Sequence, residues 1–160
     1  MHQFIISYFS HFPKELAVFL IGAIPVTELR AALPLAYNFY AMGAFWSWFY
    51  AVAGTFFTMV IIVLALDPIA KILSKHIKIF ERFFVWLFEH TRRKADKKMQ
   101  KYGTWAIFIL AASPIPFIGG MTGALAAFIF NVPLKKSLPL LLAGTMVSGA
   151  IVLGVTVYFG

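Results

Sequence analysis

The stretch Ile24-Pro25-Val26-Thr27-Glu28-Leu29-Arg30-Ala31-Ala32-Leu33-Pro34 places a carboxylate and a guanidinium close together between two prolines, with apolar chain on both sides. A charged side chain at the centre of a bilayer costs roughly 2.5–3.5 kcal/mol on insertion scales. If this stretch lies inside a membrane, the rest of the chain has to compensate Glu28 and Arg30. These two residues are therefore the first candidates for a functional site.

The composition supports a membrane environment. The chain has 160 residues, of which 61% are hydrophobic and 12% charged, and its mean hydropathy is +0.85. A soluble domain of this length keeps too many residues at its surface to bury so much apolar side chain. We therefore expect an all-α integral membrane protein. The absence of cysteine excludes disulfides, thiolate metal sites and cysteine nucleophiles.

The basic residues are gathered between the apolar segments. Ten of the fourteen Lys and Arg lie within residues 71–101, and Lys135 and Lys136 form a second, smaller group. This distribution follows the positive-inside rule, so we expect residues 71–101 and 131–136 on the cytoplasmic side of the cytoplasmic membrane. No recognition motif accompanies the charge, and we therefore expect no nucleic-acid partner.

The first apolar region is interrupted by proline. A helix that starts after Pro13 should end before Pro25, because a residue that precedes proline is pushed out of the α region. A second short helix is expected to begin near Thr27, with residues 31–41 as its body. Neither half is long enough to cross a bilayer alone, so residues 13–41 are either one broken span or a re-entrant hairpin. Residues 104–130 repeat this pattern, and Lys135 and Lys136 favour a hairpin there.

Two longer apolar segments can cross the membrane. Residues 44–66 carry no charge, and we expect Asp67-Pro68 to end their helix. Residues 137–159 form the second span. Between them, apolar residues recur at helical spacing and predict an amphipathic cytoplasmic helix. We expect a single membrane domain with four parts: an interfacial helix over 1–12, a hairpin and span over 13–66, a basic connector over 71–101, and a second hairpin and span over 104–159.

The two apolar halves resemble each other. Ala53-Gly54-Thr55 matches Ala143-Gly144-Thr145, and we align Ile24-Pro25 with Ile115-Pro116 and Asn38 with Asn131. One full crossing and one re-entrant hairpin in each half would make an inverted repeat. Paired, broken segments in such a repeat indicate a transporter's binding site near the bilayer midplane. We expect the hairpins to be shaped by Pro25, Pro34, Pro114, Pro116, Gly119, Gly120 and Gly123.

These segments resemble the small multidrug export protein family over nearly the whole chain. The resemblance rests on Pro25-x-x-Glu28-Leu29-Arg30-Ala31-Ala32-Leu33-Pro34 and on Pro114-Ile115-Pro116-Phe117-x-Gly119-Gly120-x-x-Gly123-Ala124. This family is in turn distantly similar to the DedA/VTT superfamily. That similarity implies movement of lipid across the bilayer, proton coupling and a homodimer. The second hairpin of this chain lacks the arginine of the DedA pattern.

Three functions remain open. In the first, a transporter of the flippase type moves an anionic lipid headgroup: Arg30 binds it by bidentate hydrogen bonds, Thr27 lies at a helix start beside it, and Glu28 carries a proton. The alternatives are an exporter of lipophilic cations and a structural or assembly protein in which Glu28 and Arg30 only hold the hairpin together. No catalytic motif indicates an enzyme. We expect no cofactor and, since the histidines lack ligand spacing, no metal.

Overall fold

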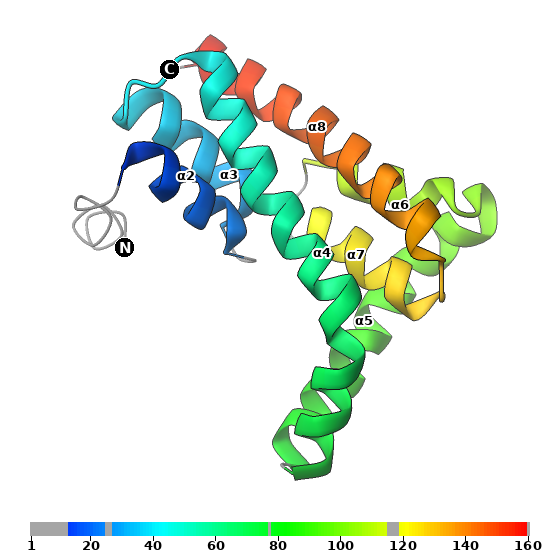
Figure 1. The fold of residues 1–160 in the computed structure, drawn as a ribbon. Coiled ribbons are helices and arrows are strands. Elements are labelled where there is room, and N and C mark those ends of the chain that lie inside the picture. The colour runs from blue at the N-terminus through cyan, green and yellow to red at the C-terminus, as the bar shows by residue number, and fades with distance from the viewer. Residues whose placement is uncertain (1–12, 25–26, 77, 115–118, 160) are drawn as a thin grey trace. The chain divides into compact units, whose positions relative to one another are not determined.

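The computed structural model describes residues 13–24, 27–76, 78–114 and 119–159, and the predicted interfacial helix over 1–12 lies outside them. Within these ranges the chain is all-helical, as the sequence predicts, and contains no strand. The elements in order are α2 (Lys14–Ala23), α3 (Glu28–Pro34), the π-helix η1 (Leu35–Phe39), α4 (Ala44–His76), α5 (Lys78–Tyr102), α6 (Trp105–Ala112), α7 (Gly120–Ile129) and α8 (Leu134–Phe159) (Figure 1).

Two segments have the length and composition of membrane spans. They are Ala44–Leu66 in α4, with 23 residues, and Leu134–Phe159 in α8, with 26. Large apolar side chains along both helices point out of the fold: Phe57, Leu64 and Val155 are each more than half exposed. Soluble monomers rarely carry such continuous apolar surface, whereas a surface that faces lipid does. The expected spans are therefore present.

One predicted helix end is wrong. The helix that begins at Ala44 does not stop at Asp67-Pro68 but continues through Pro68 to His76. Proline removes one backbone hydrogen bond and crowds the preceding turn, which costs about 3 kcal/mol in an ordinary helix. The bonds on both sides of Pro68 belong to one 33-residue helix, so the loss stays local and does not end the element.

The chain divides into two compact units, residues 1–58 with 146–160 and residues 59–145. In the first unit, α2 and α4 approach until their backbones touch. A Cβ added at Gly22 would lie 2.9 Å from the Ala51 carbonyl oxygen, and one added at Gly54 would collide with the Phe19 carbonyl. Glycine at both places allows this contact, as small residues do between membrane helices.

The core of the first unit joins α2, α3 and the start of α4. Ile21 and Leu33 are fully enclosed, and Leu29 at the start of α3 is only 4% exposed. Trp48 of α4 and Leu153 of α8 pack against this cluster from outside. The core therefore fixes α3 close behind the break that separates it from α2.

The second unit repeats the glycine contact between α6 and α8. A Cβ at Gly144 would lie 2.8 Å from the Phe108 carbonyl oxygen and 3.0 Å from the Ala112 nitrogen. Buried alanines also bring the basic connector into this unit, because Ala95 of α5 packs with Ala126 of α7. The C-terminal part of α5 is therefore a packed element rather than a detached surface helix.

The turn before each long helix uses a residue in left-handed conformation. Ala41 has φ +47° and Asn131 has φ +51°, and Val132 N–H bonds to the Ala127 carbonyl at 2.9 Å, which is a Schellman cap. Asn38, which the sequence aligns with Asn131, lies inside η1 and does not share this left-handed conformation.

A π-helix, η1, follows Pro34. Pro34 has no N–H, so the α-helical bond to the carbonyl four residues earlier cannot form. Within η1 the Tyr40 N–H bonds to the Leu35 carbonyl, five residues earlier, at 2.9 Å, which is the hydrogen bond of a π turn.

The glycine contact between α2 and α4 can be tested by Gly54→Ala. The new methyl group would force the two backbones apart, and we expect a loss of roughly 1–3 kcal/mol, the range found for overpacked sites. The measurement is the thermal midpoint of the purified protein in detergent. Gly154→Ala is the matched control, because nothing lies within 4 Å of its added Cβ. Equal midpoints for the two variants would contradict the contact.

Candidate functional site

The break between α2 and α3 begins at Ile24. Its φ and ψ are −76° and 121°, and its N–H bonds to the Ile21 carbonyl. Ser113, which follows α6 in the second unit, has nearly the same angles, −71° and 118°, and the same bond to Leu110. Ile24 and Ser113 therefore begin their breaks with the same local geometry, whereas Pro25, Ile115 and Pro116 of the sequence alignment lie outside the described residues.

Hydrogen bonds made by Thr27 join the start of α3 to the end of α2. Its hydroxyl donates to the Ile21 carbonyl at 2.7 Å and to the Ile24 carbonyl at 3.3 Å. The Ile24 carbonyl also accepts the N–H groups of Thr27 and Glu28, at 3.2 and 2.9 Å. Thr27 is the residue before the first turn of α3, which is where the sequence predicts a helix start.

Threonines of α4 satisfy the remaining carbonyls at the end of α2. The Thr55 hydroxyl donates to the Gly22 carbonyl at 3.0 Å, and the Thr58 hydroxyl donates to the Ala23 carbonyl. These carbonyls have no partner within α2, since a helix leaves its last carbonyls unpaired. The sequence alone did not predict this role for Thr55 and Thr58. The only sequence feature that pointed to it was the presence of hydroxyl side chains close to Gly54 within a predicted span.

Glu28 and Arg30 both lie in the first turn of α3. Both are half-buried, and Leu29 between them is buried. Residues two apart on a helix leave it in nearly opposite directions, so in regular helical geometry they do not face each other. Glu28 also has φ +43°, a conformation that side chains other than glycine rarely adopt. Pro34 is half-buried at the end of the same helix.

The second break is built from small residues. Gly119 precedes α7 in extended conformation, and Gly123 N–H bonds to its carbonyl at 3.0 Å. A Cβ at Gly123 would lie 3.3 Å from the Ile107 carbonyl oxygen, so the glycine permits close packing. Gly120 is buried and Pro114 is exposed. Over residues 105–114 and 119–129 the chain carries no charge. Pro25 and Pro116 lie outside the described residues.

These features define an all-helical membrane protein with two spanning helices and two interrupted helical segments. The chain belongs to the family described as "Putative small multi-drug export protein", whose model matches residues 28–151. The match begins at Glu28 and includes the first candidate span and residues 134–151 of the second. No curated protein and no solved structure matches the chain, and the similarity to the DedA superfamily stays an expectation.

Removal of the two hydroxyls tests how the break is stabilised. We expect Thr55→Ala with Thr58→Ala to lose about 2–6 kcal/mol, because each substitution leaves a carbonyl without its donor at roughly 1–3 kcal/mol. Thermal unfolding in detergent measures the loss. Thr55→Ser with Thr58→Ser keeps both donors and should stay close to wild type. A double serine variant as unstable as the double alanine variant would show that the methyl groups, not the hydroxyls, matter.

The left-handed conformation of Glu28 has a measurable consequence. Glycine adopts positive φ without strain, so Glu28→Gly should gain about 1 kcal/mol of stability, in line with the roughly 1–2 kcal/mol cost of left-handed backbone. Glu28→Gln retains a Cβ and should show no such gain. Thermal midpoints of both variants decide the matter, and a glycine variant no more stable than glutamine would contradict the strain.

Proposed function

We propose that this chain exports lipophilic small molecules across the membrane, with the break between α2 and α3 as its exchange site. Membership in a family named for small multidrug export supports this direction of function. In the proposal, Glu28 takes up and releases a proton as the substrate passes. Arg30 and Thr27 hold the local structure and polarise the site. The protein acts as a transporter and not as an enzyme.

The observation that carries the proposal is a charged residue held at a helix break inside apolar chain. Polar groups at membrane depth are tolerated where they are enclosed by protein or line an aqueous cavity, and ionisable residues there mark transport paths and proton relays. Glu28 combines half-burial, a strained backbone and a position at the first residue of α3, directly after the break. Such strain is retained where function requires it.

We further propose that both interrupted segments are re-entrant hairpins and that the two halves form an inverted repeat. The α2 helix has 10 residues and α6 has 8, and helices of this length rise only about 12–15 Å, half a bilayer. Both breaks begin with the same backbone angles. With one crossing in each half, residues 71–101 and 131–136 share the cytoplasmic side of the inner membrane.

A second candidate function is the movement of an anionic lipid headgroup. It is favoured by Arg30, whose guanidinium is half-buried in the first turn of α3 and whose planar fork suits phosphate. Membrane lipids would then be the substrate and not only the solvent. A homodimer suits either function, because a chain of 160 residues provides a thin wall around a transport path.

Transport by reconstituted vesicles tests both candidates. We expect Glu28→Gln to lower the proton-driven flux of a fluorescent lipophilic cation by at least about tenfold, because the variant cannot exchange a proton in the cycle. Arg30→Ala should lower the flux of a labelled polyprenyl phosphate more than that of the cation if the second function holds.

Glu15→Gln is the matched control, since Glu15 is another half-buried carboxylate but lies at the start of α2. It should transport like wild type. Unchanged flux of both probes in Glu28→Gln and Arg30→Ala would sink the exchange site and leave these residues a structural role.

A further inference from the structure

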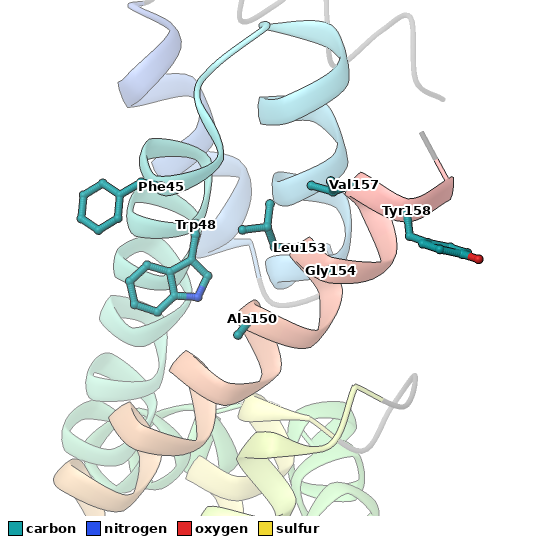
Figure 2. A pocket seen from close by; sticks show the side chains of 7 residues that line it. All are labelled: Phe45, Trp48, Ala150, Leu153, Gly154, Val157 and Tyr158. Atoms are coloured by element: carbon teal, nitrogen blue, oxygen red, sulfur yellow. The ribbon is translucent and has the colours of Figure 1, made fainter.

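An apolar groove of about 610 Å³ lies in the first unit between the start of α4 and the end of α8 (Figure 2). We propose that this groove binds a lipophilic organic cation with aromatic groups, which enters from the bilayer on its way to the break at Glu28; the route, though not the binding, rests on the proposed export function. The residues that line the groove are Phe45, Trp48, Ala150, Leu153, Gly154, Val157 and Tyr158.

The α8 wall is hollowed by residues with little or no side chain. Nothing lies within 4 Å of a Cβ added at Gly154, and Ala150 stands one turn earlier on the same helix. Gly54 and Gly144 differ, because the backbone of a neighbouring helix occupies the space beside each of them. The open space at Gly154 is therefore not required by helix packing inside the unit.

Trp48 forms the opposite wall of the groove, and a hydrogen bond fixes the position of its ring. The Trp48 indole N–H donates to the Met146 carbonyl of α8 at 3.2 Å, and Figure 2 shows its ring lying between the two helices. A Cβ at Gly149 would lie 2.9 Å from that indole nitrogen, so glycine there makes room for the ring. With its N–H engaged, the indole can offer an occupant only its π face.

The chemistry of the lining selects a cation. It contains three aromatic rings, from Phe45, Trp48 and Tyr158, and no charged side chain. A cation over an aromatic face gains about 0.5–2 kcal/mol, whereas an anion would find only the tyrosine hydroxyl as a donor. The volume of about 610 Å³ falls within the roughly 300–1,000 Å³ usual for small-molecule sites. An aromatic organic cation fits these features better than an anionic headgroup.

The groove is continuous with the candidate site. Trp48 and Leu153 line it and also pack against the core cluster that contains Leu29. Leu29 separates Glu28 from Arg30 in the first turn of α3. The groove therefore adjoins the core cluster that holds α3, and in the proposal Glu28 is the carboxylate that accepts the cation next.

Binding of radiolabelled tetraphenylphosphonium to purified protein in nanodiscs tests the groove directly. Gly154→Phe adds a large side chain at a position where an added Cβ meets no protein atom within 4 Å. We expect it to occupy the groove, to block the approach of a cation to the aromatic rings and to weaken binding by about tenfold or more. Val155→Phe is the matched control, because Val155 is a neighbouring, 53% exposed residue of α8 outside the lining. It should bind like wild type.

Three results would overturn the proposal. The first is equal binding by the Gly154→Phe and Val155→Phe variants. The second is equal competition by a neutral isostere such as tetraphenylsilane, which would indicate an ordinary lipid-facing surface. The third is a change of oligomeric state in Gly154→Phe alone, which would make the groove an interface between two copies.

Glu28→Gln separates this inference from the exchange site. It should bind the cation within about twofold of wild type, because no charged residue lines the groove, and yet lose transport. Normal binding by Gly154→Phe together with loss of transport by Glu28→Gln overturns the groove alone. Loss of binding by Gly154→Phe together with full transport by Glu28→Gln supports the groove and overturns the exchange site.

Discussion

The structure depends on how a helix can be interrupted in a medium that offers no water to its backbone. Each backbone carbonyl left without a hydrogen bond in hydrocarbon raises the free energy of the folded state. Several carbonyls at the end of α2 have no partner within that helix. Thr27 bonds to one within the turn, while Thr55 and Thr58 reach two others from α4. The adjacent Gly54 allows this, since only without a side chain can α4 come so close to α2. Glycine sets the distance, and threonine supplies the donor.

The two units share this geometry but differ in chemistry. Gly144 repeats the close approach in the second unit, yet the Thr145 hydroxyl donates to the Leu141 carbonyl of its own helix at 2.6 Å. The second break also lacks charge over its described residues, whereas the first carries Glu28 and Arg30. A repeated backbone frame thus supports one polar break and one apolar break. Substrate chemistry can then be assigned to the first alone.

Much of this frame follows from local sequence. A charge-free run of sufficient length predicts the span that begins at Ala44, and the residue before Pro25 predicts where α2 ends, because both effects act within a few residues. The prediction that Pro68 ends the helix was wrong, because a single proline removes one backbone hydrogen bond and the other hydrogen bonds of the helix outweigh that loss. The hydroxyl bonds of Thr55 and Thr58 join residues far apart in the chain, and no periodicity reports them. The π-helix after Pro34, which contains Asn38, was likewise not predicted from the sequence.

The strained residue at the break connects stability with function. Glu28 holds φ +43° although left-handed backbone costs roughly 1–2 kcal/mol. Its N–H bonds to the Ile24 carbonyl, and the buried Leu29 anchors the next residue in the core, so the surrounding contacts impose the conformation. Glycine would relieve it but would carry no proton. In the proposed function the carboxylate itself is needed at this position, and the threonine hydrogen bonds around the break stabilise a segment that includes a strained residue.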